Sequence, residues 1–251
     1  MKKRYLILAV LILFESIPLL SQEASHKWQR MSGIWEVKNS NAVETQGRAV
    51  AWNYYELLNS NSILSLKPFN NYTSIDAVIN IMDRIESPAE LIISFNITSE
   101  SKNWFYHMYA FKLCGGYWGI NKASLIYSDR SDKSKPFNTK NNTFIKELAS
   151  ADCKVKYDKV YNYRIAFEGT NVVLYINSER VLSAPFPEKS HDGRIAISAK
   201  NAKISVDRIE VKQGDKLIFE DDFDIDTIFV KILKVQKVPV NNGNIVQEKN
   251  P

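Results

Sequence analysis

The feature that most constrains the fold of this chain is the alternation of apolar and polar residues within residues 161–212. The alternation is clearest at 163–167 and 173–176, and the residues between them, 168–171, have the composition of a tight turn. Successive side chains of a strand point to opposite faces, so a period of two favours half-buried strands over helices. We therefore predict five short strands separated by turns, a pattern typical of an antiparallel sandwich.

Two more strands are predicted inside this stretch, and others on either side of it. Asp192-Gly193 introduces a strand at 194–198, and Asn201-Ala202 precedes another at 203–211. Further strands are predicted at 33–37, 42–46, 49–52, 62–66, 72–82, 90–98, 103–112 and 215–223. Gly115-Gly116 predicts a hairpin connection after the strand at 103–112.

Four of these segments, 163–167 (YRIAF), 173–177 (VLYIN), 193–197 (GRIAI) and 206–211 (VDRIEV), resemble the concanavalin A-like lectin/glucanase superfamily. The resemblance covers roughly residues 28–211. It implies an all-β fold, an antiparallel two-sheet jelly-roll sandwich of the laminin-G or lectin-like kind. Sandwiches of this type carry many activities, so the resemblance alone assigns no function.

The ends of the chain differ in character from the middle. Residues 1–21 have a basic start, an apolar core and a small residue before a cleavage point, and they predict a signal peptide. We expect an exported protein, periplasmic, cell-surface or secreted, with no membrane span in the mature chain. Residues 22–226 would form the sandwich. Residues 227–251 form a C-terminal extension that we expect to be partly disordered, and the sequence leaves open whether its apolar part is strand or helix.

One long surface excursion interrupts the strand pattern at residues 128–159, which are mostly polar. A short helix is predicted within it at 143–150, from the spacing of its apolar residues. Two cysteines, Cys114 and Cys153, lie near the start and within this excursion. In an oxidising compartment they are expected to form a disulfide bond, and two free thiols are the alternative.

The first candidate site is acidic, because Glu220, Asp222, Asp224 and Asp226 recur at every second position. Glucanases of the resembled superfamily carry Glu-x-Asp-x-Glu on a central strand, since retaining hydrolysis needs two neighbouring carboxyl groups. In this chain Asp224 replaces the second Glu, and the run follows the last jelly-roll strand. A glycoside hydrolase using Glu220, Asp222 and Asp224 is therefore an alternative only. A structural Ca²⁺ site from Asp222, Asp224 and Asp226 is a second alternative, and a solvated acidic face is the preferred interpretation.

The second candidate site is aromatic. Trp104, Tyr106 and Met108 share one face of a predicted strand, and the intervening residues share the other. One face must fill the core, while the other could be a floor on which a sugar ring stacks. Lectin-like members of the superfamily bind ligands on such a sheet. The predicted ligand contacts are Phe105, His107, Tyr109, Tyr117, Trp118 and Asn121, and cross-strand aromatic pairing that stabilises the sheet is the alternative.

Other function classes find no support in the sequence. The net charge is +5 with basic and acidic residues interspersed, so no nucleic-acid interface is indicated. Gly-x-Ser-x-Gly, zinc-ligand spacing and a glycine-rich phosphate loop are all missing from the sequence.

We thus expect a non-enzymatic binding or structural protein of a cell-surface or periplasmic assembly. Its partners would be a polysaccharide or protein subunits, and no cofactor is expected beyond the alternative Ca²⁺. A structural subunit of an extracellular filament or sheath, such as a spirochaetal flagellar sheath, is the competing hypothesis. In that case Phe229, Ile232 and Leu233 would contact the partner.

Overall fold

The structure is a computed structural model that describes residues 27–30, 35–37, 41–44, 61–101, 104–129, 145–223 and 229–231. The predicted signal peptide at 1–21 and the predicted strand at 49–52 lie outside these residues. Asp224, Asp226, Ile232 and Leu233 also lie outside them.

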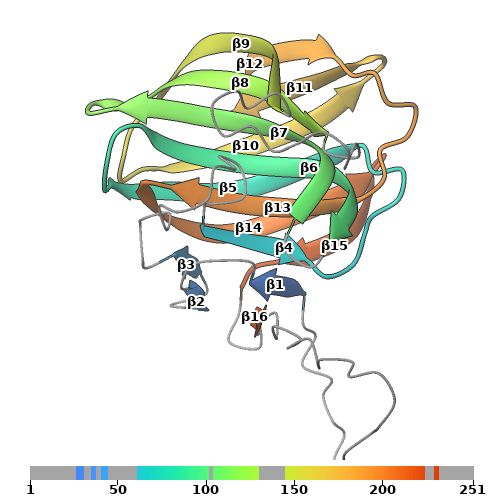
Figure 1. The fold of residues 1–251 in the computed structure, drawn as a ribbon, viewed down its shortest axis with the longest axis horizontal. Helices are drawn as coiled ribbons and strands as arrows, with labels where there is room; N and C mark the ends of the chain where they lie inside the picture. Colours follow the sequence, from blue (N-terminus) through green and yellow to red (C-terminus); the bar gives the residue numbers. More distant parts are fainter. Residues whose placement is uncertain are drawn as a thin grey trace, which may run out of the picture.

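The described strands form two packed sheets (Figure 1). We call the first one sheet A. Its strands, in spatial order, are β16 (Phe229–Lys231), β1 (Trp28–Arg30), β4 (Asn61–Ser65), β13 (Arg194–Lys200), β6 (Ala89–Ser101), β7 (Trp104–Gly116), β8 (Gly119–Asp129) and β9 (Ile145–Val155).

We call the second one sheet B. Its strands, in spatial order, are β12 (Glu179–Pro185), β11 (Asn171–Ile176), β10 (Val160–Glu168), β5 (Ser74–Arg84), β14 (Ala202–Gln213), β3 (Ala42–Glu44) and β2 (Trp35–Val37), and β15 (Lys216–Asp221) also pairs with β14. The pairs within both sheets are antiparallel, apart from β1 and β16, which run parallel. The predicted all-β, two-sheet sandwich is confirmed. In the described part of the chain, no segment forms a helix long and apolar enough to cross a membrane.

The core lies between the two sheets, and the alternation of each strand decides which side chains enter it. In β5, Ile75, Ala77, Ile79 and Ile81 are buried, whereas Asp76 and its alternating neighbours face away. In sheet A, Leu91 and Ile93 of β6 belong to the same core. The predicted inward face of the strand at 72–82 is thus confirmed, because the period-two pattern matches burial on one face.

The predicted turns also form. Asn177 and Ser178 have φ values of 50° and 68°, the left-handed backbone that a two-residue hairpin turn of this type requires. They join β11 to β12. The turn between β10 and β11 contains Gly169, whose φ is 61°.

The predicted helix at 143–150 is wrong. Residues 145–155 form β9, which pairs antiparallel with β8 along Ser128↔Ile145 to Ile120↔Val155. The ladder to β8 satisfies the backbone of this segment, and tertiary pairing overrides the weak helical spacing of its apolar residues. The polar excursion is therefore shorter than predicted: its described end is strand, and residues 130–144 lie outside the described part.

The predicted disulfide is also wrong, because both cysteines are free. Cys114 lies in β7 and Cys153 in β9, with β8 between them. Strands two positions apart are separated by roughly 9–10 Å, whereas disulfide-bonded Cα atoms lie less than about 7 Å apart. The thiols also point to opposite faces of sheet A, since Cys153 packs against the core and Cys114 lies beside Glu90 on the outer face.

Candidate binding surface

The outer face of sheet A carries a cluster of apolar side chains. Ile92 alternates with the core residues Leu91 and Ile93, so its side chain points away from sheet B. It belongs to a second apolar cluster on that outer face, made of Leu64, Ile92, Ile97, Met108, Ala110, Ile126 and Ala196. These side chains are all buried. The face that Met108 and Ala110 share is therefore not an open groove on which a sugar could stack.

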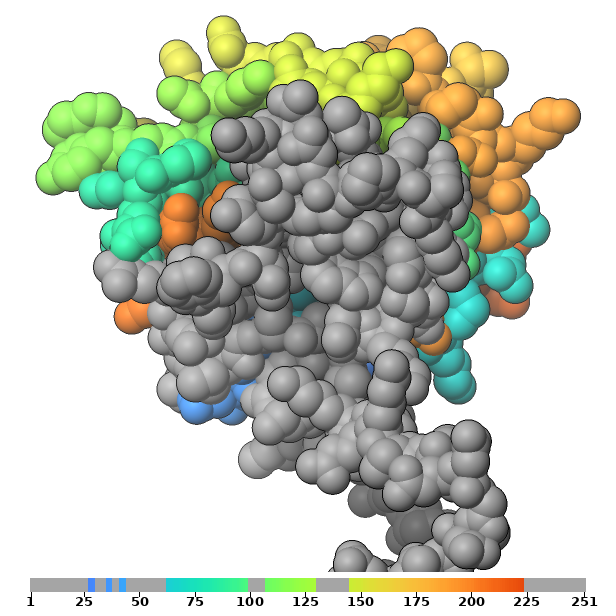
Figure 2. Space-filling view, in the orientation of Figure 1, coloured from blue at the N-terminus to red at the C-terminus, as the bar shows by residue number. Residues whose placement is uncertain are grey.

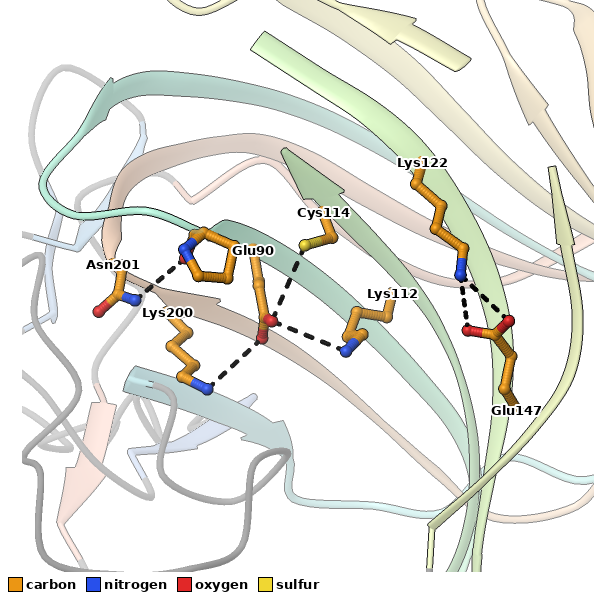
Figure 3. Close-up of polar contacts among 8 residues, drawn as sticks. Glu90, Lys112, Cys114, Lys122, Glu147, Lys200 and Asn201 are labelled. Atoms are coloured by element: carbon orange, nitrogen blue, oxygen red, sulfur yellow. Dashed lines mark hydrogen bonds and ion pairs between the residues drawn. The ribbon is translucent and has the colours of Figure 1, made fainter. Parts of the chain in front are cut away.

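A charged group borders this apolar cluster (Figure 3). The buried Glu90 carboxylate lies 3.7 Å from the Lys112 ammonium and 4.0 Å from that of Lys200, so one acid joins β6 to the strands on both sides. The Cys114 sulfur lies 4.0 Å from the same carboxylate, and burial, followed by the charge of Glu90, raises the pKa of this thiol. A thiol with a raised pKa is a poor nucleophile. The group is best explained as an ionic link across three strands.

The aromatic strand turns its predicted binding face into the core. Tyr109 is 2% exposed, and its ring lies 4.7 Å from that of Phe186 and 6.1 Å from that of Phe95. Its hydroxyl donates a hydrogen bond to Glu188, 2.9 Å away, and burial raises the pKa of Tyr109. No ligand ring can stack on a side chain in this position. The structure matches the alternative of aromatic pairing within the sheet.

His107 lies next to Tyr109 at the margin of the core. Its Nδ1 is 3.2 Å from the Tyr127 hydroxyl, and its Nε2 is 3.4 Å from the Glu188 carboxylate. Both ring nitrogens therefore face partners within the protein. Of Phe105, the structure describes the backbone in β7 alone.

Tyr117 and Trp118 are the predicted contacts that solvent reaches most freely. They form the turn between β7 and β8, two residues later than the Gly115-Gly116 connection predicted from the sequence. Tyr117 is 68% exposed and Trp118 is 89% exposed, and their rings meet edge to face at 4.9 Å. The turn projects from the left of the molecule in Figure 1, and its green atoms stand out at the same side in Figure 2.

Three contacts hold this turn in place. Gly119 has a φ of +133°, and a Cβ there would lie 2.5 Å from the Val155 carbonyl oxygen, so β9 passes too close for any other residue. The Tyr157 hydroxyl donates a hydrogen bond of 2.6 Å to the Gly116 carbonyl. The Arg84 guanidinium lies 4.8 Å from the centroid of the Tyr117 ring, a cation–π distance. The aromatic pair is thus presented on an anchored support.

Two other exposed apolar side chains lie on neighbouring strands of sheet B, Met82 in β5 and Val160 at the start of β10. Met82 is 39% exposed and Val160 is 54% exposed, and Val160 pairs with Asn80, which precedes Met82 by two residues on the same face. We call Met82, Arg84, Tyr117, Trp118 and Val160 the exposed strip, in which Arg84 is half-buried and the other four side chains are exposed. Asn121, also exposed, follows the turn in β8 and offers an amide for hydrogen bonding.

The described part of the acidic run lies elsewhere, with Glu220 in β15 and Asp222 directly after it, and between these two is the buried Asp221. Asp221 accepts hydrogen bonds from Trp28 and from the Phe223 backbone, while Glu220 and Asp222 on either side are exposed. Asp221 was not among the predicted site residues, although its position between Phe219 and Phe223 marks an inward-facing acid. Among described residues β15 pairs with β14 alone, so the run is not on a central strand as in the resembled glucanases.

The metal hypothesis stays a prediction. In the parts of the chain that the structure describes, no three His, Cys, Asp or Glu residues gather as a metal site. Asp222 is described and exposed, whereas its proposed co-ligands Asp224 and Asp226 are not described.

A charged depression of about 510 Å³ lies on the outer face of sheet B. Lys212 forms ion pairs with Glu210 at 2.7 Å and with Asp76 at 3.4 Å, and Arg164 approaches Asp76 at 3.7 Å. These contacts lower the pKa of Glu210 and raise that of Lys212. Acids and bases alternate across the strands and neutralise one another, which favours a cross-strand ionic ladder over a charged ligand site.

Phe229, predicted to contact a partner subunit, lies in β16, whose backbone pairs in parallel with Trp28 of β1. This segment is a strand, which settles the choice between strand and helix at 229–231. The other two proposed contacts, Ile232 and Leu233, lie outside the described residues, so the partner contact stays a prediction.

Comparison with known proteins identifies the fold. No family model and no curated protein matches the chain. Among solved structures it is similar to the carbohydrate-binding module CBM66 from Bacillus subtilis, with 13% identity, 72% of this chain and 91% of that one covered, and a TM-score of 0.51. It is also similar to the carbohydrate recognition domain of Emp46p in its potassium-bound form, with 11% identity, coverage of 74% and 88%, and a TM-score of 0.51. The chain therefore has the concanavalin A-like, lectin-like jelly-roll fold that the sequence predicts.

Proposed function

We propose that this protein is an exported, non-catalytic binding domain with a lectin-like jelly roll, and that it binds a glycan through Tyr117 and Trp118. The observation that carries the proposal is the Trp118 ring, 89% exposed on an anchored turn. The likeness to a structure described as a carbohydrate-binding module and to one described as a carbohydrate recognition domain supports the ligand class. The signal-like residues 1–21 support export.

The physical basis is the amphipathic surface of a sugar ring. Its C–H face stacks on an aromatic ring, and its hydroxyl groups need polar partners at the edge. Tyr117 and Trp118 supply two ring surfaces, and Asn121 supplies an amide nearby in sequence. Because the turn is held by Tyr157, Gly119 and Arg84, little conformational freedom remains to be lost on binding.

The non-catalytic assignment is supported by the chemistry of the exposed strip. Glycoside hydrolysis uses two carboxyl groups on either side of the scissile bond, about 5–9.5 Å apart. The five side chains of the exposed strip are aromatic, apolar or cationic, and the neighbouring carboxyl group of Asp83 lies opposite Lys203 rather than opposite a second carboxyl group. A sugar bound there would be held without being cleaved.

The test is polysaccharide binding by the exported chain. Retardation in affinity gels should be lost in Trp118→Ala and weakened in Tyr117→Ala. Leu217→Ala is the matched control, since Leu217 is also exposed but lies on β15. Unchanged binding by a Trp118→Ala protein with an unaltered melting temperature would overturn the proposal.

The exposed apolar residues Met82 and Val160 favour a second candidate, a structural subunit of a filament or sheath. Apolar side chains clustered at one surface are typical of protein contacts. In that case the chain would co-purify with a filament or envelope protein. Val160→Asp would abolish the association and Leu217→Asp would not.

A further inference from the structure

We propose that the ligand of the exposed strip is an acidic polysaccharide, and that Arg84 binds the carboxylate of a uronic acid residue. This inference rests on the proposed function and adds the charge of the ligand. It is carried by the position of one cation relative to the aromatic turn.

Arg84 ends β5, and its guanidinium lies over the Tyr117 ring at 4.8 Å. Other arginines of sheet B lie beside acids: Arg164 is 3.7 Å from Asp76, and Arg208 is 3.3 Å from Glu210. In the described part of the chain, Arg84 has a ring contact and no ion pair. Arg84 is half-buried, so the exposed part of this cation is open to an external anion beside the aromatic pair.

In the described part of the chain, neither of the nearest acids in sequence forms an ion pair with Arg84. Asp83 is exposed and lies opposite Lys203 in the β5–β14 ladder. Glu86 is exposed too, beyond the end of β5. Arg84 also acts on Tyr157, which anchors the turn. Burial raises the pKa of the Tyr157 hydroxyl, and the charge of Arg84 lowers it.

The chemistry of arginine matches a carboxylate in this arrangement. A guanidinium stacked on a ring keeps the N–H groups along its edge free, and those groups can donate two parallel hydrogen bonds to one carboxylate. Stacking on Tyr117 also restricts the long side chain before the ligand arrives, which reduces the entropy lost on binding. A uronic acid ring stacked on Trp118 would present its carboxylate towards Arg84.

The exposed strip has two parts. Met82 and Val160 lie on the outer face of sheet B, where Val160 pairs with Asn80. Arg84 lies opposite the buried Ala202, beyond an irregularity in the β5–β14 ladder, so its side chain leaves β5 on the other side, where it meets the aromatic turn.

The experiment compares acidic polymers with their own neutral forms. Polygalacturonate is tested beside methyl-esterified polygalacturonate, and hyaluronan and alginate beside their carboxyl-reduced forms, by titration calorimetry of the wild-type chain. We expect Arg84→Gln to lower affinity for an acidic polymer about tenfold to a hundredfold, the usual effect of one charge-assisted bidentate contact, and to leave the neutral form unaffected. Arg84→Lys should retain part of the affinity.

Arg164→Gln is the matched control, because it removes the same charge beside Asp76, eight residues and roughly 26 Å along β5 from Arg84. It should bind as the wild type does. If the acidic and neutral forms bind equally, or if Arg84→Gln weakens both alike, the acidic-ligand inference is overturned while binding through Trp118 stands. If no polymer binds in either form, the proposed function fails and this inference fails with it.

Discussion

The indole Nε1–H of Trp28 donates a hydrogen bond of 2.5 Å to the carboxylate of Asp221, which lies 193 positions later in the chain. The Lys27 ammonium approaches the same carboxylate at 3.2 Å, and the Trp28 ring stacks on that of Phe223 at 5.8 Å. Trp28 belongs to sheet A, whereas Asp221 ends a strand of sheet B. This pair therefore joins the two sheets by linking β1 of sheet A to the end of β15 of sheet B.

Asp221→Asn should destabilise the fold by about 1–3 kcal/mol, because it removes the charge that Lys27 and the indole N–H both face inside the protein. Asp222→Asn is the control: Asp222 is exposed, and its replacement should change the free energy of unfolding by less than about 0.5 kcal/mol. Urea denaturation measures both. Equal effects of the two substitutions would contradict the structural role of Asp221.

The two cysteines should behave as free thiols. Thiol titration of the unreduced, unfolded chain should find both Cys114 and Cys153. In the folded chain Cys153 should react slowly near neutral pH, because burial raises its pKa to about 11. Cys114→Ala should alter stability by less than about 1 kcal/mol, whereas loss of a native disulfide typically costs about 2–5 kcal/mol. A mass lower by two hydrogen atoms in the unreduced protein than in the reduced protein would show that the bond forms.

The cysteines illustrate which features of the fold can be predicted from the sequence and which cannot. Period-two alternation is a local property, so the strands, the turn at Asn177-Ser178 and the inward face of β5 could be predicted from it. The order of strands is not local. That β8 lies between β7 and β9, and that this separates Cys114 from Cys153, depends on which strands pair.

The free energy of unfolding should decrease in mild acid, because the ring of His191 becomes protonated. Its ring stacks on Phe167 at 3.9 Å, and its Nδ1–H donates a hydrogen bond to the Tyr72 carbonyl, 3.1 Å away. Burial lowers its pKa below 6.5, so the folded state favours the neutral ring. The stability this gives is present above pH 6.5 and is lost as the pH falls through the lowered pKa.

The measurement is urea denaturation at about pH 7.5 and about pH 5.5. The loss between the two pH values should be smaller in His191→Phe than in the wild type. A Lys189→Gln control, which changes an exposed charge two residues away, should keep the wild-type loss. An identical pH dependence in all three proteins would contradict the role assigned to His191.

Gly193→Ala should be clearly destabilising, by about 2 kcal/mol or more. The residue has a φ of +136°, and a Cβ there would lie 2.8 Å from the Ile97 backbone nitrogen. Gly214→Ala is the matched control, since its φ is +60° and no atom lies within 4 Å of its added Cβ. It should cost only about 1 kcal/mol, the strain of the left-handed backbone. Thermal unfolding of the two variants checks this order, and a reversed order would contradict the close approach at β6.

Only part of the candidate site could be predicted from the sequence, because burial and the order of strands depend on residues far apart in the chain. The residues Tyr117 and Trp118 were named from their aromatic character, but the sequence placed them on a strand rather than at the turn that exposes them. Which face of β7 enters the core could not be decided from alternation, because both faces carry apolar residues. Arg84 was missed, since its contact with Tyr117 joins β5 of sheet B to the turn between β7 and β8 of sheet A.

The most direct test of the central claim is hydrogen–deuterium exchange of the full chain with and without a bound polysaccharide. If the exposed strip is the binding surface, added protection should appear at residues 116–121 and 82–84. Protection confined to β6, β13 and β4, on the outer face of sheet A, with no change at 116–121, would contradict it.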